Sequence, residues 1–238
     1  MIPNTSIITY NIYQGGRDKV GEIHDFLTNQ QPDILAIQEA CNWDQEKQQY
    51  TLASKLNIPE HNIVYAHANP GRSSANRIYD LILFSRFPII SQSILNDPNK
   101  IWHAAIISTI DVPNLEKVQI INCHLSSKSV EWRLKELDFI FNLESYHDDI
   151  PTILMGDLNS LSPNDPYQSS ITQELKDQNI TKFDNPPTFN VLKKLFQMGF
   201  ENHCLFEPTV LSSAEDKDHL DLRLDYILTK HINHKQIH

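Results

Sequence analysis

The sequence predicts a single α+β domain in which two packed β-sheets are covered by helices. Short β-branched runs recur along the chain with segments of helical periodicity between them, and 40% of the 238 residues are hydrophobic. A chain of this size can bury one substantial core, and it suits one large domain better than two small ones. We therefore expect one domain over residues 1–238.

Strands and helices alternate in the first third of the chain. β-Branched and aromatic residues over 6–12 predict a strand, and apolar residues at helical spacing over 20–27 predict a helix that ends before Gln31 and Pro32. Further along, the pattern predicts an apolar strand at 33–37, a polar helix at 47–56, a strand at 62–67 and a Gly/Ser/Asn loop at 71–76.

The middle of the chain reads as a run of antiparallel strands. Pro and Asn/Asp turns separate four apolar runs, at residues 81–84, 89–95, 104–110 and 118–123. An apolar face at helical spacing follows over 132–143, and then a buried strand over 152–155.

The last third is less regular. Residues 160–187 are rich in Pro, Asn, Asp and Ser, which predicts a long, partly irregular excursion over the surface, and such loops often border the substrate. A short helix at 191–198, ended by Gly199, and a late strand at 222–228 complete the expected elements.

The charge disfavours one class of partner. The chain has 20 Lys+Arg against 30 Asp+Glu, a formal net charge of -10. Most of such a surface repels a long nucleic-acid duplex, whereas a small phosphoester, a lipid headgroup or a strand entering one locally basic cleft stays compatible with it.

The cysteines and the N-terminal region bear on the compartment. Cys41, Cys123 and Cys204 are odd in number and far apart, which indicates neither a disulfide framework nor a zinc ribbon and favours a reducing environment. The sequence shows no signal-like leader and no run of about eighteen apolar residues. We expect a cytoplasmic protein without a transmembrane segment, and export by a route without a signal stays open.

Two polar residues at strand ends predict a site for a hard divalent cation. Glu39 follows the apolar run 33–38, and Asn11 closes the strand at 6–12. Mg²⁺ takes oxygen ligands, retains several waters and is commonly held by one or two carboxylates plus a substrate phosphate. Each residue alone is more often a solvated strand end or a turn former. Their combination leads us to assign Mg²⁺, or Mn²⁺ as the alternative, to Glu39 and Asn11.

The segment from Gly156 to Ser160 is the most specific in the chain. A buried strand runs into Gly156 and then presents Asp157 and Asn159, which in an extended chain point to the same side. Water that attacks phosphorus must lose a proton, and a nearby carboxylate contributes about 10² to 10⁴ in rate. We assign this base to Asp157 and the orientation of phosphate or water to Asn159. The alternative is an Asx-turn in which both side chains bond their own backbone.

A third strand end offers partners for phosphate oxygens. His124 ends the strand at 118–123, and Ser126 and Lys128 add donors in the loop that follows. Arg77, before the strand at 81–84, is a further candidate for substrate binding. An isolated histidine is more often a satisfied structural residue, and a loop arginine is as often a surface charge.

Together these segments resemble the endonuclease/exonuclease/phosphatase superfamily. Residues 77–89 resemble its Gly-x-x-Ile-Leu-Ser-Arg-x-Pro-Ile segment, with Asp80 at the usual glycine position, and residues 223–228 resemble its late Arg-Ile-Asp-Tyr-Ile strand. The resemblance runs from Ile7 to Leu228. Its four short motifs are Tyr10-Asn11-Ile12, Ile37-Gln38-Glu39, Asn122-Cys123-His124-Leu125-Ser126 and Gly156-Asp157-Leu158-Asn159.

The resemblance implies a four-layer αββα sandwich and two further roles. His124 stands at the position of the family's phosphate-contacting histidine. Asp225 stands at that of the aspartate that orients a final catalytic histidine, with a surface charge beside Arg223 as the alternative.

The chain departs from the family pattern near its end. Members normally carry Ser-Asp-His after the late strand and then one more strand, whereas here His231, His234 and His238 fit a solvated tail and Asp218-His219 lies before Asp225. We expect a C-terminally incomplete domain that lacks the last strand and is weakly active at best. A naturally degenerate, binding-only member is the alternative.

The expected function is Mg²⁺-dependent hydrolysis of a phosphodiester or phosphomonoester by water. The acidic charge and the lack of an extended basic stripe favour a small-molecule, lipid-headgroup or single-stranded nucleic-acid substrate. A nuclease acting on DNA or RNA is the nearest alternative, and a catalytically degenerate binding module is the alternative from another class. Fold alone does not choose among them.

Overall fold

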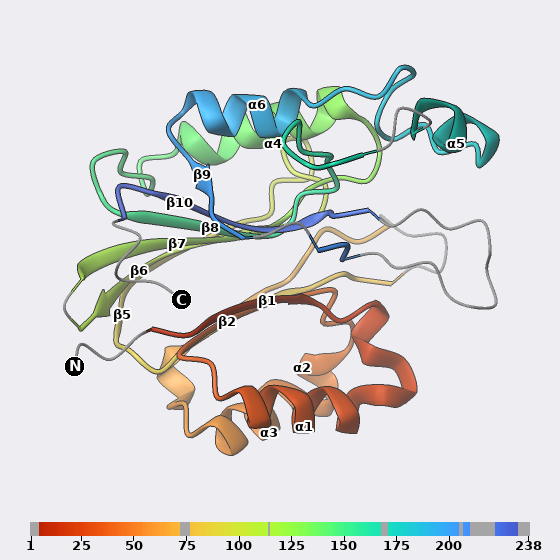
Figure 1. Cartoon of the computed structure of the whole chain (residues 1–238). Helices are drawn as coiled ribbons and strands as arrows, with labels where there is room; N and C mark the ends of the chain where they lie inside the picture. The colour runs from red at the N-terminus through yellow and green to blue at the C-terminus, as the bar shows by residue number, and fades with distance from the viewer. Residues whose placement is uncertain are drawn as a thin grey trace.

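Two β-sheets pack face to face, and helices cover both outer faces (Figure 1). The computed structural model describes residues 5–71, 77–113, 115–167, 171–204, 207–209 and 222–232. Strand order is β1-β2-β4-β3 in the four-stranded sheet and β5-β6-β7-β8-β10-β9 in the six-stranded sheet. The predicted α+β class and the four layers of an αββα sandwich are confirmed.

The first sheet and its helices come from the N-terminal third of the chain. Parallel pairing of β1 with β2 requires a crossover, which α1 provides, and β4 pairs antiparallel with both β2 and β3. The strands are β1 (Ile7–Asn11), β2 (Ile34–Gln38), β3 (Ile63–Ala66) and β4 (Leu81–Ser85), and the helices are η1 (Gln14–Lys19), α1 (Val20–Gln30), α2 (Trp43–Glu46), α3 (Gln48–Leu56) and η2 (Glu60–Asn62).

The second sheet contains the antiparallel run that the sequence predicts. Strands β5, β6 and β7 pair antiparallel in chain order, whereas β7 and β8 are parallel and are joined through α4. The strands are β5 (Ile89–Leu95), β6 (Ala105–Val112), β7 (Glu116–His124), β8 (Thr152–Asp157), β9 (Glu201–Asn202) and β10 (Asp225–Lys230), and the helices are α4 (Val130–Phe141), α5 (Ile171–Asp177) and α6 (Asn190–Gln197). In the described part of the chain, no helix has both the length and the apolar character to cross a bilayer.

Apolar side chains fill the three spaces between the four layers. One cluster lies between the six-stranded sheet and α4 with α6, one between the two sheets, and one between the four-stranded sheet and α1 to α3. Strand β2 is buried along its whole length, which explains why it reads as a continuous apolar run. Burial of this apolar area is the main favourable term for the fold.

The C-terminal region differs from the sequence-based expectation in detail. Strand β10 begins at Asp225, three residues later than predicted, because Leu224 N donates to Thr209 Oγ1 at 2.9 Å and the Arg223 guanidinium pairs with the Asp165 carboxylate. The excursion after β8 contains α5 between turns, and the two-residue β9 is too short to leave a pattern in the sequence.

Two fully buried amide side chains link the sheets just behind the strand ends. Gln38 Nε2 donates to Asn122 Oδ1 at 2.9 Å, and Asn122 Nδ2 donates to Ile82 O at 3.0 Å. A buried amide without a partner is costly, so this pairing favours one relative placement of β2, β4 and β7. It sets the register of the residues that follow, Glu39 after β2 and His124 at the end of β7.

Gly156 is required where β8 passes β7. Its φ is 133°, and a Cβ on it would lie 2.0 Å from Cys123 O. We predict that Gly156→Ala lowers the free energy of unfolding by about 2–5 kcal/mol, through backbone strain and overpacking. Gly21→Ala in α1, where a Cβ meets nothing within 4 Å, should instead raise it by about 0.5–1 kcal/mol. Urea denaturation measures both, and equal stability of the Gly156 variant and the wild type would contradict this reading.

Candidate active site

The Asn11 side chain joins the two sheets at their polar end. Its Nδ2 lies 3.2 Å from Glu39 Oε1 and 3.1 Å from Asp157 Oδ2, so one amide donates to a carboxylate of each sheet. Asn11 ends β1, Glu39 follows β2, and Asp157 ends β8. The structure therefore brings these three predicted residues into one site, although 146 positions separate the first from the last.

Glu39 is held in a left-handed backbone conformation. Its φ is 62°, which is uncommon for a residue with a side chain. Gln14 N donates to Glu39 Oε2 at 2.8 Å, and Gly15 N donates to Glu39 O at 2.7 Å. Both carboxylate oxygens therefore already accept hydrogen bonds from the chain, so the carboxylate is fixed before any ligand binds.

The loop that holds Glu39 is itself strained. Five consecutive residues, Tyr13 to Arg17, have positive φ, and three of them are not glycine. Trp43 Nε1 donates to Gly15 O at 3.0 Å, and a Cβ on Gly15 would lie 2.5 Å from Cys41 O. Such strain persists only where surrounding contacts enforce it, and it clusters at functional sites.

Asn11 is oriented by the same loop. Its Oδ1, the atom expected to bind a metal, accepts a hydrogen bond from Tyr13 N at 3.0 Å. An amide oxygen has two lone pairs, so this bond leaves a second acceptor position.

Asp157 and Asn159 reach the site through a turn rather than an extended strand. Asn159 has φ 46°, and its N donates to Asp157 Oδ1 at 2.8 Å, so the Asx-turn alternative is partly realised. The other oxygen, Oδ2, faces Asn11 and His124. Asn159 Nδ2 donates to Leu125 O at 2.9 Å, and its Oδ1 accepts from Lys182 Nζ at 2.8 Å.

His124 lies against Asp157 and within a group of rings. Its Nε2 is 3.5 Å from Asp157 Oδ2. The His103 ring stacks on it with centroids 4.2 Å apart, and Tyr79 packs against both imidazoles. Both histidines are almost fully buried, so their planes are fixed by packing. His103 follows Trp102 in a loop before β6 and carries no motif that sequence reasoning could have used.

Ser126 stabilises the loop that follows β7. It is fully buried; its N donates to Glu136 Oε2 at 2.8 Å and its Oγ accepts from Lys128 N at 3.0 Å. Glu136 Oε1 also accepts from Trp102 N at 2.7 Å, so this one carboxylate ties the His124 loop to the His103 loop. Burial raises the pKa of Glu136 to about 7. This placement argues against direct contact of Ser126 with a substrate.

The two other predicted substrate-binding residues, Lys128 and Arg77, are exposed. Lys128 is exposed, and its ammonium lies over the rings of Trp102 at 5.2 Å and Trp132 at 5.7 Å. Arg77 is exposed just before β4, and its charge acts on Cys41, two residues after Glu39. Substrate contact by either residue stays a prediction.

Asp80, at the family's glycine position, is a structural carboxylate. It is buried and accepts hydrogen bonds from Ala68 N at 2.9 Å and from the Tyr65 hydroxyl at 2.7 Å. Its backbone oxygen accepts from Ala40 N, next to Glu39. Asp80 therefore helps to hold the segment that carries Glu39.

Asp225 lies next to Asp157 on the neighbouring strand. The two residues are directly paired in the antiparallel ladder of β10 and β8. Burial and the nearby Asp157 charge raise the pKa of Asp225 to about 7. Its Oδ1 is buried and has no hydrogen-bond partner among the described residues. The expected partner of Asp225, a late histidine, is not assigned among the described residues. His219, His234 and His238 lie outside the described residues, and His231 bonds Asp148 O at the far end of β10.

Lys182 is a site residue that sequence reasoning missed. It comes from the irregular excursion after β8, and its ammonium bonds Asn159 Oδ1. Arg133, fully buried in α4, donates to Lys182 O at 2.6 Å and to Ser126 O at 2.9 Å. No sequence pattern marks Lys182. The one relevant signal is that it lies in the irregular segment 160–187, which we expected to border the substrate.

The donor set fits a hard divalent cation. Glu39, Asp157 and Asp225 concentrate negative charge, and Asp225 Oδ1, which has no hydrogen-bond partner among the described residues, is a buried oxygen available to a cation. Among the described residues, no three His, Cys, Asp or Glu side chains already form a metal cage. Mg²⁺ needs no such cage, because it keeps waters and uses one or two carboxylates.

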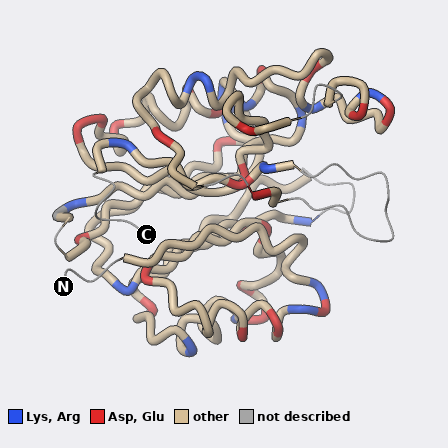
Figure 2. Tube along the Cα trace, viewed as in Figure 1, with Lys and Arg blue, Asp and Glu red and all other residues tan. Residues whose placement is uncertain are grey.

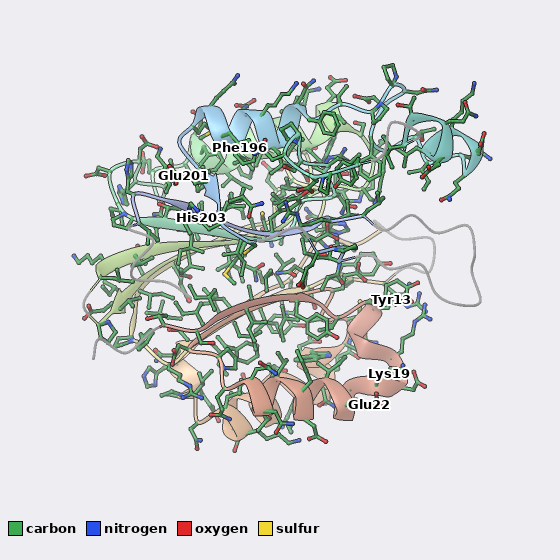
Figure 3. All side chains as sticks on the ribbon, in the orientation of Figure 1. Tyr13, Lys19, Glu22, Phe196, Glu201 and His203 are labelled. Carbon is green, nitrogen blue, oxygen red and sulfur yellow. The ribbon has the colours of Figure 1, made fainter. Side chains whose placement is uncertain are left out.

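A separate hollow lies behind the strained loop, between β1 and α1. It has a volume of about 540 Å³, and its lining includes Tyr13, Lys19 and Glu22, which Figure 3 labels. The ring of Phe26 borders it and makes an edge contact with Tyr10 at 6.0 Å. Because Asn11 points to the other sheet, this hollow is on the opposite side of β1 from the carboxylates.

Positively and negatively charged residues are mixed along the described part of the chain. Figure 2 shows Lys and Arg scattered among Asp and Glu along the described trace, with no continuous basic stripe in that view. In this view of the described residues, the distribution agrees with the net charge of -10 and shows no extended basic track of the kind that a long duplex requires.

A family model described as Endonuclease/Exonuclease/phosphatase family matches residues 8–237. The chain belongs to this family. No curated protein sequence matches the chain significantly. The family assignment therefore depends on the model match and on the fold, and it confirms the resemblance drawn from the four motifs.

Solved structures of endonuclease/exonuclease/phosphatase proteins share the fold. One from Beutenbergia cavernae DSM 12333 superposes with a TM-score of 0.69 at 16% identity, over 96% of this chain and 64% of that chain. This chain thus spans less than two thirds of that relative. The human Nocturnin catalytic domain gives 0.57 at 16% identity over 96% and 82%, and an AP endonuclease from Archaeoglobus fulgidus gives 0.59 at 16% over 95% and 86%. At such identities the likeness shows the fold alone.

Asp225 should destabilise the folded protein at neutral and alkaline pH. Its folded pKa of about 7 lies above the ordinary value, so the fold favours the protonated form and loses stability as pH rises from about 4 to 7. We predict that Asp225→Asn raises Tm at pH 8, by about 2–4 °C per kcal/mol of relieved repulsion, and leaves it nearly unchanged at pH 4.

Thermal unfolding in a chelating buffer measures this difference. The matched control is Asp149→Asn, which removes an exposed carboxylate and should leave Tm unchanged at both pH values. A Tm gain for Asp225→Asn that is equal at pH 4 and pH 8 would contradict the assignment.

Proposed function

We propose that the chain is a metal-dependent phosphoesterase that hydrolyses its substrate by direct attack of water. The observation that carries this proposal is the Asn11 amide, which lies within hydrogen-bond distance of both Glu39 and Asp157. The proposed cation ligand and the proposed base therefore lie close together. Membership of the endonuclease/exonuclease/phosphatase family supports the same class of reaction.

Glu39 and Asn11 are the proposed ligands of Mg²⁺, with Mn²⁺ as the alternative. The bound cation would supply Lewis-acid polarisation of the phosphoryl group. Glu39 suits this role because its carboxylate is fixed by Gln14 N and Asn11 Nδ2 rather than by another charge.

Asp157 is the proposed general base. Two hydrogen bonds, from Asn159 N and Asn11 Nδ2, hold the carboxylate, and a carboxylate has about four lone-pair positions. It can therefore accept the proton of the attacking water while its orientation is kept. The water oxygen bonds to phosphorus, the ester P–O bond breaks, and no covalent intermediate with the protein is needed.

His124, Asn159 and Asp225 have the proposed supporting roles. His124, whose Nε2 lies 3.5 Å from Asp157 Oδ2, is the proposed contact of a phosphate oxygen, and the stacked His103 ring fixes its plane. Asn159 is proposed to orient the phosphate or the water, and its own amide is held in place by the hydrogen bond from Lys182 Nζ. Asp225 adds a carboxylate opposite Asp157 and stays the proposed orienting acid.

The proposed substrate is a small phosphoester, a lipid headgroup or a single-stranded nucleic acid. The net charge and the scattered Lys and Arg support this choice over a long duplex. A nuclease acting on DNA or RNA is the nearest alternative. A panel of chromogenic phosphodiesters and monoesters, assayed with Mg²⁺ and with a chelator, tests the class, and no metal-dependent turnover of any of them would favour a binding module instead.

Asp157→Asn should abolish turnover. We expect kcat on a chromogenic phosphodiester to fall by about 10² to 10⁴, because the amide cannot accept the proton of water. Mg²⁺ binding, measured by calorimetry, should change little. Asp149→Asn is the matched control for an exposed aspartate. An unaltered rate in the Asp157 variant would remove it from the mechanism.

Glu39→Gln should act chiefly on the cation. We expect the Mg²⁺ concentration for half-maximal rate to rise by about 10- to 100-fold or more, since even loss of a residue that only supports a metal ligand costs that much. The exposed Glu144→Gln is the control. Metal dependence identical to that of the wild type would show that Glu39 is not a ligand.

A further inference from the structure

Lys182 brings a positive charge to a site that contains three carboxylates. Its ammonium lies 2.8 Å from Asn159 Oδ1, next to the turn that carries Asp157. The charges of Asp157 and Asp225 both act on it. The residue belongs to the segment between β8 and α6, remote in sequence from the strand ends that supply the other site residues.

The position of Lys182 is fixed from three directions. Its backbone oxygen accepts a 2.6 Å hydrogen bond from Arg133 Nη2, and the next residue, Phe183, is fully buried. The ammonium also lies 5.0 Å from the centre of the Phe183 ring. Because Arg133 also donates to Ser126 O, the same guanidinium sets Lys182 relative to the His124 loop. A surface lysine without function needs no such support.

The ammonium has donors to offer to a ligand. An ammonium carries three N–H donors, and Asn159 takes one of them. Within the described residues, Lys182 forms no ion pair and no other side-chain hydrogen bond. The residue as a whole is partly exposed, and two of its three ammonium donors are not used by the described residues. Burial lowers the pKa of Lys182, and the Asp157 charge opposes that change.

We propose that Lys182 is a catalytic residue that binds a non-bridging oxygen of the phosphoryl group and stabilises the negative charge that develops there. This inference rests on the proposed function, because it concerns the same phosphoester. The ligand class is a phosphate oxyanion. The carboxylates of Glu39, Asp157 and Asp225 would otherwise repel such a group, and a fixed cation near Asp157 and Asp225 reduces that repulsion.

A purely structural role makes a different prediction. In that role, Lys182 would only hold the Asn159 amide, and an uncharged donor would serve as well. Lys182→Gln keeps an N–H donor for Asn159 and removes the charge, whereas Lys182→Arg keeps the charge. Lys176→Met, which removes an exposed lysine of α5 in the same excursion, is the control for net charge.

Two measurements test the proposal in the full chain. The first is the affinity for inorganic phosphate in the presence of Mg²⁺, by calorimetry, which needs no turnover. The second is kcat on the chromogenic phosphodiester. We expect Lys182→Gln to weaken phosphate binding at least about tenfold and to lower kcat by about 10²–10³. Lys182→Arg should recover part of both, Mg²⁺ affinity should be retained, and Lys176→Met should match the wild type.

The outcomes separate this inference from the proposed function. Normal phosphate binding by a folded Lys182→Gln variant overturns the inference, and so does a wild type that binds no phosphate. If the wild type binds phosphate through Lys182 but hydrolyses nothing, the proposed function fails while the oxyanion site stands. If Lys182→Gln proves unfolded, a folded Lys182→Met is measured in the same two ways, and wild-type phosphate affinity in that variant equally overturns the proposal.

Discussion

The structure depends on polar contacts that cross the interface between two apolar sheets. Gln38 and Asn122 pair at its buried end, and Asn11 joins Glu39 to Asp157 at its open end. Apolar packing alone tolerates small slips between two sheets, whereas buried amides are satisfied in few relative positions. These contacts therefore convert a general α+β sandwich into one arrangement in which loops of both sheets meet.

A second set of contacts holds the walls of the site. Glu136 connects the loops of Trp102 and Ser126, and Arg133 connects Ser126 to Lys182. Both residues lie on α4, three positions apart, on the face that covers the six-stranded sheet. One helix thus positions a histidine loop and a lysine loop together, and these two charged residues can be buried because each of them satisfies backbone groups.

The strand ends could be predicted from sequence because their signals are local. Apolar runs mark the strands, and the first polar residue after such a run is visible, as with Glu39 and His124. Lys182 and His103 could not be found in this way, since they arrive through irregular segments whose paths depend on tertiary contacts. Ser126 shows that a predicted position does not give the direction of a side chain. Its place after a strand could be predicted, but only the geometry of the turn decides that its hydroxyl points inward.

The strained loop from Tyr13 to Arg17 has a consequence for how this protein can be altered. Its shape is set by backbone atoms, since Gly15 bonds Glu39 and Trp43 and lies against Cys41. Its outward side chains contribute less to that shape: Tyr13 is 55% exposed, and the Arg17 guanidinium lies over its ring and donates to Gln14 Oε1. The surface of the hollow between β1 and α1 can therefore be altered through the Tyr13 and Arg17 side chains, while the backbone contacts that hold Glu39 stay in place.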